Sequence, residues 1–165
     1  MFENTISPLK RALSSLSHIL KIAQAHADAK SIEHNVLLNA RLFPDMFPLI
    51  RQVQIATDMS KGGVARLAGI EIPQYEDTET SFADLQNRID KTIAFINTVV
   101  PNQFENAETR DITITVRKMD LHFNGQDYLL KWVMPNVYFH VTTTYNILRH
   151  NGVELGKPDF LRISD

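Results

Sequence analysis

The sequence predicts an all-α protein, a four-helix bundle with a small β-hairpin inserted before the last helix. Four segments carry apolar residues at intervals of three and four, the spacing of one buried face on an α-helix. One β-branched, alternating segment near an Asn-Gly pair interrupts this helical pattern. Helices with one apolar face each bury those faces most economically against one another, which favours a bundle.

The length of 165 residues fits a single domain, 1–165. Apolar residues make up 44% of the chain and charged residues 22%, a balance typical of globular rather than disordered proteins. The formal net charge of −2 lacks the basic footprint of a nucleic-acid binder, so no nucleic-acid partner is expected.

No segment has the roughly 18 to 20 uninterrupted apolar residues of a membrane span, and the N-terminus has no signal-peptide pattern. We therefore expect no membrane association and a cytoplasmic location. The absence of cysteine excludes disulfides, thiolate nucleophiles and cysteine-ligated zinc.

The first helix is predicted to run from Ser7 to about Lys30. A serine oxygen can cap a free backbone N–H, and Pro8 suits the first helical position because its missing N–H would have no partner there. The segment 31–43 has an ambiguous period and is expected to be a connector with a short helix or turn. The apolar stripe consists of Leu9, Leu13, Leu16, Leu20, Ala23 and Ala27.

The second helix is predicted to begin near Pro48 and to end about twenty residues later at Gly69, a typical C-terminal cap. The following stretch, 71–80, contains a proline and four acids and is expected to be a solvated loop. The third helix is predicted to begin at Ser81, with Asp84 completing a capping box, and to end before Pro101.

The β-hairpin is predicted from the alternating segment 112–116, with its tight turn at Asn124-Gly125. Pro135 is expected to open the last helix, which should stop at Asn151-Gly152. The tail, 153–165, is expected to be extended.

Three polar residues form the candidate site. At 100° per residue, Gln52 lies near the apolar face of the second helix, whereas Asp58 lies roughly opposite that face. His140 lies on the flank of the last helix, and Asn136 lies one turn earlier on the same flank. If the two helices are neighbours, Gln52, Asn136 and His140 can converge in a small polar pocket at the edge of the core.

The order of elements and four strings resemble the DinB-like (YfiT-like) four-helix superfamily of metalloenzymes, and within it an uncharacterised single-domain branch. The resemblance implies the bundle fold and a homodimer. The strings are RLFPDMFPLIRQVQIATD (41–58), KGGVARLAG (61–69), PQYEDTETSFADLQNRI (73–89) and PNVYFHVTTTYNILRHNGVELGKPDFL (135–161).

The resemblance also implies a metal site made of one histidine from the second helix and a His-x-x-x-His pair from the last. His140 matches the second member of that pair, Asn136 stands in place of the first, and Gln52 occupies the position on the second helix. Amide oxygens bind zinc or nickel far more weakly than imidazole does. We therefore expect a degraded metal site, with His140, Gln52 and Asn136 holding zinc or nickel weakly at most and no cofactor firmly.

Three functions stay open, and no catalytic residue is assigned. The first is an uncharacterised DinB-like protein whose pocket at Gln52, Asn136 and His140 takes a small-molecule ligand, or in which these side chains only satisfy one another. The second is a divalent-metal-dependent thiol transferase or hydrolase-like enzyme, the chemistry that the resemblance implies. The third is a non-catalytic dimeric module that binds a ligand or a protein.

The other histidines and acids are expected to lie at the surface. His18, His26 and His34 recur every eight residues and cannot share one helix face. Phe139 points away from the apolar face of its helix, so either a subunit interface or another part of the chain is expected to cover it.

Overall fold

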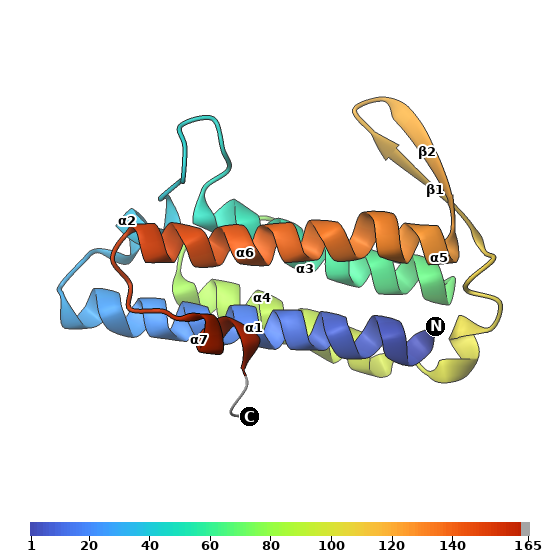
Figure 1. Ribbon diagram of the computed structural model, residues 1–165, viewed down its shortest axis with the longest axis horizontal. Helices are drawn as coiled ribbons and strands as arrows, with labels where there is room; N and C mark the ends of the chain where they lie inside the picture. Colours follow the sequence, from blue (N-terminus) through green and yellow to red (C-terminus); the bar gives the residue numbers. More distant parts are fainter. Residues whose placement is uncertain (163–165) are drawn as a thin grey trace.

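The computed structural model describes residues 1–162. Its four long helices are α1 (Phe2–Ala29), α3 (Leu49–Ala68), α4 (Phe82–Thr98) and α6 (Met134–His150). They lie lengthwise against one another, with α1 and α6 running in one direction and α3 and α4 in the other (Figure 1). The predicted four-helix bundle with a small hairpin before the last helix is confirmed.

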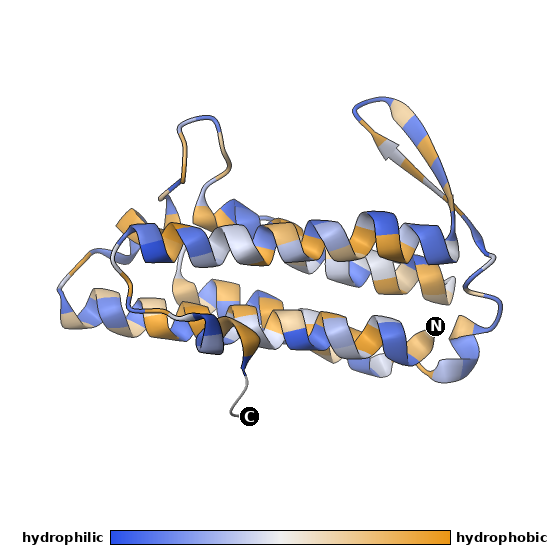
Figure 2. Cartoon of the chain, viewed as in Figure 1, coloured by the Kyte–Doolittle hydropathy of each residue, from blue (hydrophilic) through white to orange (hydrophobic). Residues whose placement is uncertain are grey.

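The core lies along the axis of the bundle, where each helix buries one apolar stripe. Leu9, Leu13, Leu16 and Leu20 of α1 are fully buried. In Figure 2 every long helix alternates between orange apolar bands and blue polar bands, as expected of a helix with one face in a core. No helix in residues 1–162 combines the length and the apolar character needed to cross a bilayer.

The first helix begins at Phe2, so the prediction that Ser7 and Pro8 open it is wrong. Pro8 lies inside α1. Tertiary contacts hold the turns before it: the ring of Phe2 packs edge-on against Phe104, at 5.4 Å between centroids, and Thr5 and Ile6 are buried. This packing outweighs the one backbone hydrogen bond that proline cannot make.

Several predicted boundaries are confirmed. A short helix, α2 (His34–Leu38), lies in the connector. α3 ends at Gly69, which adopts the left-handed conformation with φ of 68°. At the start of α4, the backbone N–H of Asp84 donates to the Ser81 side chain at 3.1 Å, and the Asp84 carboxylate accepts from the Ser81 N–H at 3.0 Å.

The hairpin consists of β1 (Asp111–Val116) and β2 (Met119–Asn124), but its turn is not at Asn124-Gly125 as predicted. The turn is Arg117-Lys118, and both residues have positive φ, 48° and 69°. Asn124 pairs with Asp111 at the open end of the hairpin. The register buries Ile112 and Ile114 on one face, and this burial decides the pairing over the turn preference of Asn-Gly.

α6 begins at Met134 with Pro135 in its first turn, as predicted, but a helical segment that was not predicted precedes it from Gly125. Asn124 caps α5 (Gly125–Asp127) by accepting from the Asp127 N–H at 2.8 Å. A π-helical segment, η2 (Tyr128–Val133), then leads directly into α6. The π turn precedes Pro135 and accommodates its missing N–H, so proline interrupts the α-helical pattern without ending the helix.

The tail is not fully extended as predicted, because α7 (Lys157–Leu161) forms within it. α7 lies beside α1 (Figure 1). Phe160 packs edge-on against Tyr145, at 5.9 Å between ring centroids, and this contact explains why the segment folds back onto the bundle. The last part of the predicted extended tail, 163–165, lies outside the described residues.

Gly125→Ala is expected to lower the free energy of unfolding by about 2 kcal/mol, because overpacking against backbone cannot be relieved by a side-chain movement. A Cβ at position 125 would lie 1.7 Å from the carbonyl oxygen of Ala107. Urea unfolding of the variant measures the effect. Gly62→Ala is the matched control: its Cβ would meet only the flexible end of Arg66, so no loss is expected. Equal stability of the two variants would contradict the prediction.

Candidate functional site

Gln52 and His140 meet between α3 and α6, which pack along one another. Gln52 is 2% exposed and His140 is 8% exposed. The imidazole Nδ1 lies 2.7 Å from the Gln52 side-chain oxygen Oε1, a hydrogen bond between the two helices. These two of the three predicted site residues are therefore brought together.

The hydrogen bonds of Gln52 fix the tautomer of His140. The amide nitrogen of Gln52 donates to the backbone carbonyl of Phe47 at 2.9 Å, and a carbonyl can only accept. The amide oxygen is therefore the atom that faces His140 and accepts its hydrogen bond. It follows that Nδ1 carries the proton of the neutral imidazole and that Nε2 keeps a free lone pair.

The imidazole is neutral over the physiological range. Burial first and the positive charge of Arg51 second lower the pKa of His140 from its usual 6.5 to about 4. Both effects disfavour the imidazolium form. The pair is thus a neutral hydrogen-bonded unit, and its available group is an acceptor nitrogen.

The Nε2 atom of His140 keeps some contact with solvent although the residue is only 8% exposed. Every buried side-chain nitrogen or oxygen among residues 1–162 has a hydrogen-bond partner, whereas Nε2 has no partner in that part of the chain. Phe139 packs edge-on against the imidazole at 5.2 Å between centroids and is itself 56% exposed. Phe47, which supplies the carbonyl for Gln52, is 55% exposed. An open acceptor therefore lies beside exposed aromatic surface.

Asn136 does not join the pair by a hydrogen bond. Its amide nitrogen donates to the carbonyl of Trp132 at 2.7 Å, within the π-helical region of the last helix. It is half-buried and lies one turn before His140 on the same helix. The predicted convergence of three side chains thus holds for Gln52 and His140, and Asn136 lies next to them.

The residues present do not fit a tightly held transition metal. In the described part of the chain, no group of three or more His, Asp or Glu side chains is arranged to hold an ion. Nδ1 of His140 and Oε1 of Gln52 are already engaged with each other, which leaves one imidazole nitrogen as a donor. A single imidazole with neutral amide neighbours is a poor donor set for zinc or nickel.

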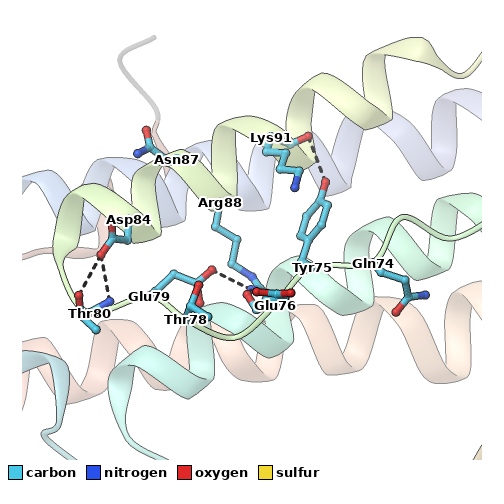
Figure 3. A pocket seen from close by; sticks show the side chains of 10 residues that line it. All are labelled: Gln74, Tyr75, Glu76, Thr78, Glu79, Thr80, Asp84, Asn87, Arg88 and Lys91. Atoms are coloured by element: carbon cyan, nitrogen blue, oxygen red, sulfur yellow. Dashed lines mark hydrogen bonds and ion pairs between the residues drawn. The ribbon is translucent and has the colours of Figure 1, made fainter.

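A second polar cluster was not predicted from the sequence, and Arg88 of α4 is its centre. The Arg88 side chain is 2% exposed and reaches the loop between α3 and α4 (Figure 3). Its Nη2 lies 2.8 Å from Asp58 and 3.1 Å from Asp77, and its Nη1 lies 2.8 Å from Glu79. A sequence signal existed, because Arg88 falls within the apolar stripe of its helix, between Leu85 and Ile89.

This cluster corrects one expectation and qualifies another. Asp58 was expected to lie away from the core, and its side chain is 34% exposed, although its carboxylate also binds Arg88. The acidic stretch 71–80 was expected to be solvated, yet Glu79 is only 10% exposed and, with Asp77, pairs with Arg88. Desolvating a guanidinium requires acceptors on all sides, and the loop folds onto α4 to supply them.

Arg88 donates four hydrogen bonds and forms an ion pair with Asp77 as well, so the cluster is a structural clamp. The donors not yet accounted for bind the Thr57 hydroxyl at 2.7 Å and the Glu76 carbonyl at 3.1 Å. Burial lowers the pKa of Arg88, but the hydrogen bond with Glu79 and the nearby carboxylates outweigh it and raise that pKa above its usual value. An open hollow of about 660 Å³ lies beside the clamp, and the charge of Arg88 is already compensated there by three carboxylates (Figure 3).

The remaining histidines form no shared site. His18 lies 3.5 Å from Asp159, His34 lies 2.7 Å from Asp28, and His122 is bound to Thr113 at 2.9 Å in the hairpin. Each therefore has a separate partner on a separate part of the surface.

The comparisons with known proteins agree with the fold. Residues 1–161 match the family described as "Domain of unknown function (DUF1993)". The crystal structure of a DinB family member protein from Shewanella denitrificans superposes with a TM-score of 0.91 and 41% sequence identity, covering 97% of this chain and 90% of that one. No curated protein matches the chain.

Proposed function

This chain belongs to the DUF1993 family and has the DinB-like fold, and from that premise we propose that it is a metal-independent ligand-binding protein. Its site is the Gln52–His140 pair with the exposed rings beside it. The ligand is a small molecule that donates an N–H or O–H to Nε2 of His140 and lays an apolar part on Phe139. We propose a homodimer as its assembly, with Phe139 near the subunit interface.

The observation that carries the proposal is the orientation of the Gln52 amide. Because Phe47 binds the amide nitrogen, the amide oxygen must hold the Nδ1 proton of His140. The pair therefore holds one imidazole in a fixed position and tautomer between α3 and α6. What it offers to a ligand is a neutral acceptor rather than a Lewis acid.

Metal analysis separates this proposal from a metal-dependent thiol transferase or hydrolase-like enzyme. We expect protein purified without a nickel column to contain far less than one zinc or nickel ion per chain. About one transition ion per chain, lost in His140→Ala, would overturn the proposal and favour the enzyme.

Nitrogen NMR of the imidazole supplies a second measurement. We expect Nδ1 to be protonated and Nε2 to be unprotonated in the wild type, and this tautomer preference to be weaker in Gln52→Leu.

Replacing the two amides of the candidate site by histidine is expected to create a metal site. Gln52→His/Asn136→His places histidines at all three positions of the ligand set on α3 and α6, and zinc affinity is expected to rise by more than about tenfold. Zinc titration by calorimetry measures the change. Gln52→Leu/Asn136→Leu is the matched control and should gain nothing. If the wild type already binds zinc as tightly as the double-histidine variant, the amides do not weaken the site and the proposal fails.

A further inference from the structure

A second pocket, of about 320 Å³, lies between α3, the hairpin and the π-helical segment η2. Its walls include Arg66 of α3, Ile114 of β1 and Trp132 of η2. Arg66 follows Gln52 by fourteen residues, which is roughly 21 Å along the helix at 1.5 Å per residue. This pocket shares no residue with the Gln52–His140 pair and is independent of the proposed function.

Arg66 is a cation without a carboxylate partner. Its Nη1 donates to the Tyr128 hydroxyl at 3.2 Å and to the carbonyl of Gly62 at 3.3 Å, both long contacts. Among residues 1–162 it forms no ion pair, and its Nε and Nη2 groups donate to nothing there. Arg88 shows the contrast within the same fold, because it donates four hydrogen bonds and pairs with three carboxylates.

The two unused donor groups of Arg66, Nε and Nη2, form the edge of the guanidinium that can bind a carboxylate. Nε and Nη2 of a guanidinium lie side by side and can form two parallel hydrogen bonds to one carboxylate. Arg66 is half-buried at the pocket wall, so a paired anion would be screened less than one on an open surface. The geometry of this side chain therefore fits a bidentate anion.

The charge of the lining also favours an anion. Its charged residues are Asp58, Lys61 and Arg66, two cations and one carboxylate. Asp58 is already neutralised, because Lys61 lies 2.8 Å from it and Arg88 binds the same oxygen at 2.8 Å. The charge that stays uncompensated at the pocket is the guanidinium of Arg66.

The remaining walls are apolar and aromatic. Ile114 and Val116 face the pocket from β1, and Trp132 faces it from η2. Tyr128, also from η2, is buried, and burial raises the pKa of its phenol, so the hydroxyl stays neutral beside Arg66. A π turn carries an extra residue, and such turns are frequent where a helix lines a functional site.

We propose that this pocket binds a small organic carboxylate with an apolar or aromatic body. Arg66 holds the carboxylate through Nε and Nη2, and Trp132 and Ile114 hold the apolar body. A volume of about 320 Å³ lies at the small end of ligand pockets, so the ligand is a compact acid rather than a nucleotide or a peptide.

The chain has one tryptophan and four tyrosines, so fluorescence excited at the red edge of the absorption band, where tyrosine does not absorb, reports on Trp132 alone. We expect a saturable fluorescence change on titration with benzoate and at least about a tenfold weaker response to its neutral isostere benzamide. Arg66→Gln is expected to weaken benzoate binding at least about tenfold. Arg66→Lys is expected to bind benzoate with intermediate affinity, because the lysine ammonium keeps the charge but cannot form two parallel hydrogen bonds to one carboxylate. Arg149→Gln, the same change at an exposed arginine of α6, should leave binding unchanged.

Each contrary result overturns the proposal. Equal binding of benzoate and benzamide would show that the anion is not recognised, and unchanged binding in both Arg66 variants would remove Arg66 from the site. Binding of inorganic phosphate without binding of benzoate would assign the pocket to a different anion. No saturable response to any probe in the wild type would show that the pocket is not a site for such acids. Metal content does not enter this test, so its failure is distinct from failure of the proposed function.

Discussion

Arg88→Met is expected to lower the free energy of unfolding by about 3 to 5 kcal/mol, the usual cost of removing one partner from a buried ion cluster. The side chain is 2% exposed, and methionine replaces the aliphatic part of arginine without the guanidinium and its charge. Glu79, 10% exposed, would lose its ion pair with Arg88, and Asp77 would keep only Arg51. Asp58 would keep Lys61 at 2.8 Å, so the largest cost falls on Glu79.

Urea unfolding with matched variants measures this effect. Lys21→Met, the same loss of charge at an exposed position of α1, is expected to change the unfolding free energy by no more than about 0.5 kcal/mol. Adding Glu79→Gln to Arg88→Met should recover part of the loss, because the stranded carboxylate is then neutral. A loss below about 1 kcal/mol in Arg88→Met would contradict the view that the cluster clamps the loop onto α4.

The long helices could be predicted from the sequence because their apolar stripes and caps are local signals. Both the apolar stripe of α4 and its Ser81–Asp84 capping box are set by residues a few positions apart, so the sequence alone predicts them. The errors occurred where tertiary contacts decide the outcome. Packing of Phe2 on Phe104 extends α1 beyond Pro8, and burial of Ile112 and Ile114 sets the hairpin register against the turn preference at Asn124-Gly125.

Pro135 explains why the helical segment before α6 was not predicted. Pro135 has a strong preference for the start of a helix, and only the π segment allows the chain to be helical before it. A π turn leaves no distinct pattern in the sequence. The start of α6 was therefore predicted to within one residue, but the helical segment 125–133 before it, which carries Trp132, was not predicted.

The candidate site shows the same limit. A helical wheel could place Gln52 and His140 on inward flanks, and the two do meet. Asn136 lies on the same flank, but the wheel cannot show that the Trp132 carbonyl takes its amide. Arg88 and its carboxylates come from three separate segments, and no local pattern joins Asp58, Asp77 and Glu79 before the chain is folded.

The stability of the protein is expected to fall by about 3 kcal/mol between pH 6.5 and pH 4 because of His140 alone. Its pKa is about 4 in the folded state against a usual value of 6.5, through burial first and Arg51 second. As the pH falls below 6.5, His140 is protonated in the unfolded chain but stays neutral in the folded chain, so the free energy of unfolding decreases. Above pH 6.5 neither state is protonated and the full stability is present; below pH 4 both are protonated and the loss stops.

Urea unfolding from pH 7 to pH 4 isolates this effect when wild type and His140→Gln are compared. The difference in their unfolding free energies should shrink by about 3 kcal/mol over that interval, since the variant has no group to titrate there. In Arg51→Gln the loss of a nearby positive charge should raise the pKa of His140 and reduce the fall in stability. Parallel pH profiles of wild type and His140→Gln would show that His140 is not held neutral. The assignment of a bare Nε2 in contact with solvent, and with it the ligand site at Gln52 and His140, would then be untenable.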